Sequence, residues 1–189
     1  MSQAPTTHLP SGAPGTRLPR TERTTLSPEA EAEILALAER WPDRLSATLP
    51  ALYVAMAEFG FLSLDAMKEV ARVLRIPEGH VFGVATFYTM YQKKPVGRFH
   101  IQVCTNLSCS LRGAVELFER LCAKVGVHPG EVSPDGVFSV EEVECLGSCG
   151  SAPCLQVNHE VYDEFVDEAV LDRILDECRR GARKAWGAK

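Results

Sequence analysis

The sequence predicts an α/β protein in which a small helical bundle precedes a compact α/β sandwich. Two observations indicate this order. Apolar residues recur at helical spacing as far as Pro95, and beyond Gly97 they first alternate with polar residues, as in a β-strand. Residues 1–26 are rich in Pro, Ser, Thr and Gly and are expected to form a disordered tail. The bundle is predicted at 27–96, the α/β domain at 97–181 and a C-terminal tail at 182–189.

Composition and charge exclude several classes of protein. Of the 189 residues, 46% are hydrophobic and 24% are charged, which are the values of an ordinary globular protein. The formal net charge of −5 does not favour a nucleic-acid partner. No apolar run is long enough to cross a membrane, and the prolines of the tail spoil the amphipathic helix that an organelle transit peptide needs.

The first three helices of the bundle are predicted from their ends and from their apolar faces. They are expected to begin at Ser27, at Thr48 with Pro50, and at Ser63, and Gly60 is expected to end the second. Their inward faces are predicted to hold Ile34, Leu37, Ala38 and Trp41 in the first helix, Leu52, Tyr53, Met56 and Phe59 in the second, and Met67, Val70, Ala71 and Leu74 in the third.

A fourth helix, expected to begin at Pro77, differs in kind because residues 80–91 are apolar or aromatic nearly all round. Such a helix is either the buried centre of its own bundle or is covered by a partner, and Phe87, Tyr88 and Tyr91 are compatible with both. Lys93-Lys94-Pro95 is expected to end it.

The α/β domain is predicted to begin with a strand, because Phe99, Ile101 and Val103 alternate with polar residues. A helix from Ser110, a turn at 133–136, a strand at 137–144, a hairpin of 154–157 and 160–163 and a helix from about Asp167 should follow. The inward residues of the two helices are predicted to be Leu111, Ala114, Val115, Phe118, Leu121, Cys122 and Val125, and Val170, Leu171, Ile174, Leu175 and Cys178.

Seven cysteines are the unusual feature of the composition. An odd number without an apolar signal segment argues against a disulfide scaffold and favours thiolates as metal ligands. Cys104 and Cys109 follow the first predicted strand, and Cys145 and Cys149 follow the second. Loops that leave the carboxyl ends of neighbouring strands lie side by side, so these four thiols can converge on one point.

The remaining three cysteines are expected to have other roles. Cys122 and Cys178 lie on apolar helix faces, where a free cysteine behaves as a small hydrophobic residue. Cys154 opens a strand after Ala152-Pro153, and its role stays open.

Four thiolates on two loops allow zinc, a dithiol redox centre or an iron–sulfur cluster. The spacings C-x4-C and C-x3-C are close to those of structural zinc sites without being typical, and the C-x-x-C of dithiol oxidoreductases is absent. A [2Fe–2S] cluster takes two thiolates per iron, which suits two separate loops. Cys109 is expected just before a helix N-cap, and Gly147 and Gly150 let backbone approach sulfur. The spacing thus favours the cluster and leaves zinc open.

Three stretches of the chain are recognisable together: residues 83–91, 104–109 and 144–153. They resemble the thioredoxin-like [2Fe–2S] subunit of NADH:quinone oxidoreductase, the NuoE-type subunit of respiratory complex I, over about residues 27–180. The resemblance implies a thioredoxin-like ferredoxin domain preceded by a small helical bundle. It also implies a [2Fe–2S] cluster whose iron is held by Cys104, Cys109, Cys145 and Cys149.

The resemblance further implies an electron-transfer subunit that docks on the flavin-bearing, NADH-oxidising subunit beside other peripheral-arm subunits of complex I. FMN and NADH are expected on that partner, because this chain has no GxGxxG, no P-loop and no catalytic acid/base pair. The expected location is cytoplasmic, peripheral to the inner face of the cell membrane, without direct membrane insertion. Two alternatives stay open: the equivalent diaphorase-side subunit of an NAD-linked hydrogenase or formate dehydrogenase, and a zinc-stabilised thioredoxin-like binding module without redox activity.

Two finer expectations concern the neighbourhood of these cysteines. Cys104 and Cys109 should hold one iron, and Cys145 and Cys149 the other, because thiolates a few residues apart reach one ion most easily. Three carboxylates precede Cys145, and in an alternating strand Glu142 and Glu144 share one face while Glu141 takes the other. At least one carboxylate should lie close enough to a cluster to lower its reduction potential, unless all three line a solvated strand edge.

Overall fold

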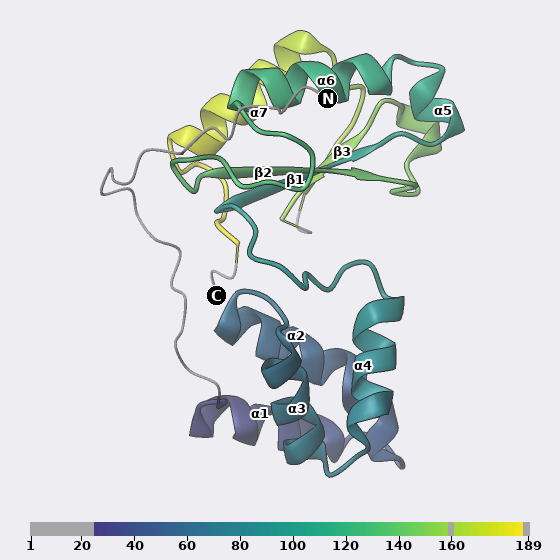
Figure 1. Ribbon diagram of the computed structural model, residues 1–189. Helices are drawn as coiled ribbons and strands as arrows, with labels where there is room; N and C mark the ends of the chain where they lie inside the picture. Colours follow the sequence, from purple (N-terminus) through teal and green to yellow (C-terminus); the bar gives the residue numbers. More distant parts are fainter. Residues whose placement is uncertain (1–24, 159–160, 187–189) are drawn as a thin grey trace, which may run out of the picture.

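The computed structural model describes residues 25–158 and 161–186 and consists of a helical bundle and an α/β sandwich (Figure 1). Residues 1–24, which hold most of the predicted tail, lie outside the described residues. Helices α6 and α7 cover one face of the sheet, and the bundle lies on the side of the other face (Figure 1). In the part of the chain that the structure describes, every helix is too short or too polar to span a bilayer.

The bundle forms where the capping residues predict it. Ser27 and Ser63 accept hydrogen bonds at their hydroxyl oxygens from Ala30 N–H and Ala66 N–H, and Gly60 ends the second helix at a φ of +81°. All the helices contribute to one apolar core. The elements are α1 (Pro28–Ala38), the 3₁₀ turn η1 (Arg44–Ala47), α2 (Thr48–Phe59), α3 (Leu64–Leu74) and α4 (Glu78–Phe87).

Three expectations for the bundle are wrong. Tyr53, expected on the inward face of α2, is 42% exposed. Because α1 ends at Ala38, Trp41 lies beyond the helix and is 48% exposed instead of facing the core. Helix α4 ends at Phe87, and the following residues leave the helix, with Tyr88 in an extended conformation. Aromatic and β-branched residues are weak helix formers, so packing decides their conformation here. Tyr91 is fully buried and its hydroxyl donates to the Leu49 carbonyl at 2.9 Å.

The sheet has four strands in the order β2-β1-β3-β4. Strands β1 and β2 are parallel, whereas β3 pairs antiparallel with both β1 and β4. The predicted hairpin is therefore confirmed, although His159 in its turn lies outside the described residues. The strands are β1 (Phe99–Cys104), β2 (Phe138–Val143), β3 (Leu155–Val157) and β4 (Val161–Asp163).

The helix expected from Ser110 begins later, at Ala114, and a separate short helix precedes it. A short α5 (Leu107–Ser110) is followed by α6 (Ala114–Val125), and Gly113 between them has a φ of +86° that other residues rarely adopt. The break turns Leu111 to the surface, where it is 79% exposed, and Val115 is 45% exposed. The remaining elements are the 3₁₀ turn η2 (Cys149–Ser151) and α7 (Glu168–Arg179).

The polar face of β1 is buried instead of facing solvent. His100 is 4% exposed, its Nδ1 lies 2.8 Å from Ser139 Oγ, and its Nε2 lies 3.1 Å from a Glu141 oxygen and 3.2 Å from Gln92 Nε2. Gln102, 5% exposed, donates to the same Glu141 carboxylate. Polar side chains are buried at low cost when they bond one another in this way.

Trp186, expected in a C-terminal tail, packs between the bundle and the sheet. Its indole N–H donates to the Gly60 carbonyl at 2.8 Å, and its backbone N–H donates to the Arg98 carbonyl at 2.8 Å. Its ring lies 6.0 Å from the His100 ring, edge to face. Close by, the backbone at Gly97 packs directly against the backbone of β2. A side chain does not fit there, since a Cβ would lie 2.4 Å from the Phe138 carbonyl carbon.

Candidate metal centre

The site lies where the two parallel strands end. Cys104 is the last residue of β1, and Cys145 is the second residue after β2. The Cys104 thiol lies 3.7 Å from the Glu144 carbonyl oxygen, to which it donates. The loops after β1 and β2 are therefore in contact, as their position at the carboxyl ends of parallel neighbours predicts.

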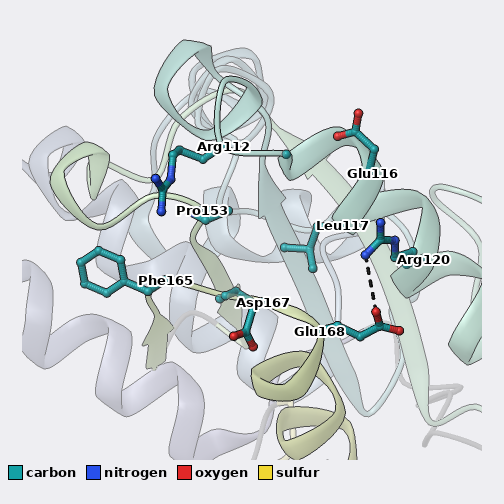
Figure 2. Close-up of a pocket in the computed structure, with 10 residues that line it drawn as sticks. Arg112, Glu116, Leu117, Arg120, Pro153, Phe165, Asp167 and Glu168 are labelled. Atoms are coloured by element: carbon teal, nitrogen blue, oxygen red, sulfur yellow. Dashed lines mark ion pairs between the residues drawn. The ribbon is translucent and has the colours of Figure 1, made fainter.

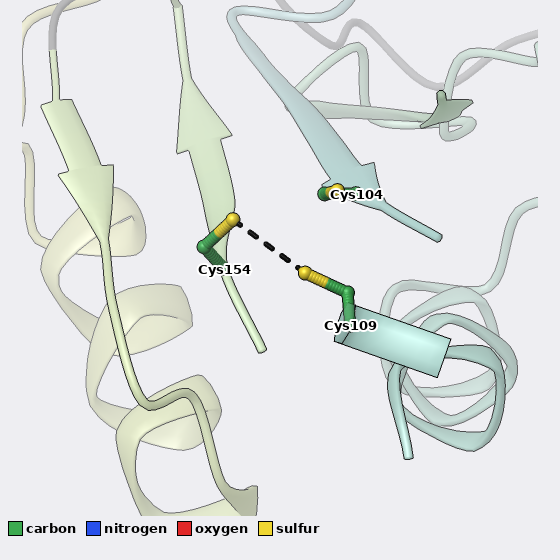
Figure 3. Close-up of side chains that lie close together, drawn as sticks. All are labelled: Cys104, Cys109 and Cys154. Atoms are coloured by element: carbon green, nitrogen blue, oxygen red, sulfur yellow. Dashed lines mark hydrogen bonds between the residues drawn. The ribbon is translucent and has the colours of Figure 1, made fainter. Parts of the chain in front are cut away.

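Three thiols form the buried part of the site. The Sγ atoms of Cys104, Cys109 and Cys154 all lie within 4.8 Å of one another, and each residue is at most 2% exposed (Figure 3). The three residues come from the end of β1, from α5 and from the position just before β3. Ala114 and Ala152 pack against them, so the thiols occupy a small apolar cluster of their own.

Cys145 and Cys149 form the exposed part. Cys145 Sγ accepts a hydrogen bond of 3.3 Å from the Gly147 N–H, and the φ of +81° at Gly147 allows this tight turn. The structure thus places two of the four predicted ligands at the surface and the other two in the buried group.

A carboxylate holds the loop that carries the exposed thiols. The Ser148 and Ser151 hydroxyls donate to the Glu164 carboxylate at 2.5 and 2.7 Å. These hydrogen bonds lower the pKa of Glu164. The loop between β2 and β3 is therefore anchored close to Cys149 without using either thiol.

The buried thiols differ in acidity. Burial alone would raise the pKa of the Cys104 thiol, but hydrogen bonds from the backbone N–H groups of Asn106 and Leu146 and from the neighbouring thiols outweigh it, so that this pKa is lowered. Burial raises the pKa of Cys109 and, together with the neighbouring thiols, raises that of Cys154 to about 12. Cys104 is therefore the thiol of this group that most readily becomes a thiolate.

These residues fit a group that takes thiolate ligands. Cys104 and Cys109 already lie together, and the Leu146 N–H that bonds Cys104 lies on the loop between Cys145 and Cys149. A [2Fe–2S] cluster needs four thiolates from two such pairs, and a single zinc ion needs three or four. The donor set suits either.

The sequence leaves the role of Cys154 open, and the expected position of Cys109 just before a helix N-cap is wrong. Cys109 lies inside α5 and does not precede the N-cap of α6, because the chain turns at Gly113 first. The pairing of Val103 with Leu155 continues to Cys104 and Cys154, where the Cys104 N–H donates to the Cys154 carbonyl at 3.2 Å. The signal that could have found Cys154 is this register, which requires knowing that β1 pairs with β3.

The two other cysteines lie apart from the site, as predicted. Cys178 is fully buried in the core beneath α7, and burial raises its pKa to about 11. Cys122 is half-buried on α6 and packs against the same core. Both behave as small hydrophobic residues.

A cavity of about 520 Å³ lies between α6 and the segment before α7 (Figure 2). Charges of both signs line it, and Arg120 pairs with Glu168 at 3.5 Å. Its lining, as far as the described residues show, holds no cysteine. A lining that carries both signs of charge favours no particular ligand.

Comparison with known proteins agrees with the site. The family model described as thioredoxin-like [2Fe–2S] ferredoxin matches residues 34–179. One NADH-quinone oxidoreductase subunit, from Rhizobium meliloti (strain 1021), is 44% identical over 151 residues, which are 80% of this chain and 89% of the relative. Another, from Thermus thermophilus, is 46% identical over 140 residues, which are 74% of this chain and 77% of the relative.

A solved structure shares the fold. The crystal structure of an air-oxidised NAD+-reducing [NiFe]-hydrogenase superposes with a TM-score of 0.62 at 24% identity, and the match covers 72% of this chain and 23% of the hydrogenase chain. At that identity the likeness shows the fold alone. The family model and the two relatives show more: this chain belongs to the thioredoxin-like [2Fe–2S] ferredoxin family.

Proposed function

We propose that this chain is the electron-transfer subunit of an NADH:quinone oxidoreductase and holds one [2Fe–2S] cluster through Cys104, Cys109, Cys145 and Cys149. The observation that carries the proposal is the meeting of two cysteine loops at the carboxyl ends of β1 and β2, where the Leu146 N–H bonds the Cys104 sulfur. The names of the two relatives point to the same kind of complex. A bound [2Fe–2S] cluster supplies one-electron chemistry.

Within this proposal the two cysteine pairs have different tasks. Cys104 and Cys109 would hold one iron and keep water away from it, since both residues are at most 2% exposed. Cys145 and Cys149 would hold the other iron, and both residues are exposed. The exposed pair would therefore be the part of the site that a redox partner can approach.

The partner in this proposal is the flavin-bearing, NADH-oxidising subunit, which brings FMN and NADH. Two exposed leucines flank Cys109 at the two ends of α5: Leu107 is 70% exposed and Leu111 is 79% exposed. Large exposed apolar side chains are typical of protein interfaces. With the other peripheral-arm subunits, the assembly would lie on the cytoplasmic face of the cell membrane.

The absorption spectrum of the anaerobically purified full chain tests the cofactor. We expect a brown protein that bleaches on reduction and contains iron and acid-labile sulfide. A colourless protein that contains zinc would support the zinc-stabilised binding module instead.

Serine substitutions test the ligands. Cys104→Ser, Cys109→Ser, Cys145→Ser and Cys149→Ser should each lose most of the cluster. Cys178→Ser is the matched control, because this buried thiol lies in another core. Normal iron content and a normal EPR signal in Cys145→Ser would show that the ligand set is wrong.

Purification of the tagged chain from its own cells tests the assembly. We expect other proteins of an NADH:quinone oxidoreductase to purify with it. Recovery of hydrogenase or formate dehydrogenase proteins would assign the chain to one of those complexes, and the fold it shares with the hydrogenase makes this the main alternative.

A further inference from the structure

The buried thiol group contains one cysteine that the ligand set proposed above does not use. Cys154 Sγ lies 3.8 Å from Cys109 Sγ, and both lie within 4.8 Å of Cys104 Sγ (Figure 3). We propose that Cys104, Cys109 and Cys154 form a binding site for a single thiophilic metal ion, with zinc as the expected occupant, in the chain that carries no cluster.

The spacing of the three sulfur atoms fits one ion. Zinc binds thiolate sulfur at about 2.3 Å, which puts two sulfurs of one tetrahedral ion about 3.8 Å apart. The Cys109–Cys154 separation has this value, and the other two separations exceed it by at most 1.0 Å. Three sulfurs bind the ion, and one position of the tetrahedron is left for a fourth ligand. Each thiol releases its proton as its sulfur binds.

The backbone holds the three donors in place before the ion arrives. Cys104 ends β1 and Cys154 lies just before β3, which pairs with β1, and the Cys104 N–H donates to the Cys154 carbonyl at 3.2 Å. Cys109 lies on α5, whose Asn106 cap bonds the Leu107 N–H at 2.7 Å. Donors that are already positioned lose little conformational entropy on binding, which favours this trio over the exposed Cys145 and Cys149.

The ion site and the proposed cluster exclude each other because both need Cys104 and Cys109. This competition rests on the proposed function, whereas the ion site by itself does not. The consequence is that zinc protects the buried thiols until iron and sulfide replace it, and Cys154 is then released as an ordinary buried thiol.

X-ray absorption at the zinc edge tests the ion site directly on the cluster-free full chain. We expect one zinc per chain, with three sulfur ligands at about 2.3 Å. The decisive variant is Cys145→Ser/Cys149→Ser, which removes the exposed thiols and should keep the same three-sulfur zinc. A four-sulfur zinc in the unmodified chain that is lost in this double variant would overturn the proposal.

Replacing Cys154 should have the opposite effect to replacing the exposed cysteines, namely weaker zinc binding. Cys154→Ser should lose tight zinc binding, and Cys154→Ala serves as a second variant if the first melts at a lower temperature. The matched control, Cys178→Ser, should bind zinc as the unmodified chain does. Unchanged zinc affinity and sulfur count in both Cys154 variants would also overturn the proposal.

Competition between zinc and the cluster tests the ion site and the proposed function separately. Iron and sulfide should assemble the cluster in Cys154→Ser without the delay that zinc causes in the unmodified chain. If no variant assembles a cluster but the three-sulfur zinc persists, the proposed function fails and the ion site stands. If the cluster assembles and zinc instead binds the exposed Cys145 and Cys149, the proposed function stands and the ion site fails.

Discussion

Glu141 and Glu142 are adjacent in β2 and face opposite sides of the sheet, as strand alternation predicts. Glu141 bonds His100 and Gln102 on the side of the bundle, and the hydrogen bond from His100 lowers its pKa. Glu142 accepts a 2.6 Å hydrogen bond from the hydroxyl of Thr105, the residue after Cys104. Of these two carboxylates, only that of Glu142 contacts the residue next to a proposed ligand.

We therefore expect Glu142→Gln to raise the midpoint potential of the cluster by tens of millivolts. Reduction adds negative charge, and at an effective dielectric constant of about 20 to 40 one carboxylate about 10 Å away opposes it by on the order of 1 kcal/mol. Potentiometric EPR titration measures the shift. Glu141→Gln is the control and should shift the potential less. An unchanged or lowered potential in Glu142→Gln would assign this carboxylate to a solvated strand edge.

Candidate ligands can be found from the sequence where residues of the same type lie a few positions apart. The pairs Cys104/Cys109 and Cys145/Cys149 stand out because each spans a few positions of the chain. Cys154 did not, since its neighbours in space are 45 and 50 positions away and depend on the pairing of β1 with β3. Long-range register has no local signal.

In α4 and the segment that follows it, one aromatic residue lies on the surface and another packs in the core. Phe87 is 77% exposed at the end of α4, whereas Tyr91 is fully buried against Tyr53, at a ring distance of 5.1 Å. The interpretation of this stretch as bundle core therefore holds for Tyr91. Phe87 is exposed enough to contact a partner.

Replacing these two aromatic residues should give opposite results. Tyr91→Ala should lower the free energy of unfolding by about 3–5 kcal/mol, since it empties a core position. Phe87→Ala should change it by less than about 0.5 kcal/mol and weaken binding to the proposed flavin-bearing partner. Urea unfolding of the full chain and co-purification measure the two effects. Equal losses of stability would place Phe87 in the core as well.

Helix beginnings were predicted better than helix interiors. Ser27, Ser63 and Asp167 cap α1, α3 and α7 as expected, because a capping side chain bonds the backbone within three residues. The end of α4 and the break between α5 and α6 were missed. At both points helical spacing of apolar residues continues, while packing or a glycine changes the backbone.

At the scale of the whole molecule, we propose that residues 27–96 and 97–181 form two folding units, each with its own core. Apolar residues of the bundle make one cluster, and those of the sheet, α6 and α7 make another. Trp186 joins them through Gly60 on one side and Arg98 and His100 on the other.

Trp186→Ala should uncouple the two units. We expect a loss of about 1–3 kcal/mol in unfolding free energy, from one half-buried ring and one hydrogen bond, and a broader unfolding transition. Trp41→Ala is the matched control, because the other tryptophan of the chain is 48% exposed. Circular dichroism during urea unfolding compares the variants. The same sharp transition in both would mean that the units are joined by other contacts.

The position of Trp186 also orders events during protein synthesis. Residues 27–96 leave the ribosome first, and their helices make mostly local contacts, so the bundle can fold while the sheet is still being made. All seven cysteines are translated before Trp186. The contacts of Trp186 with Gly60, Arg98 and His100 therefore form only after every cysteine has been translated, so that metal can reach the thiols before these contacts exist.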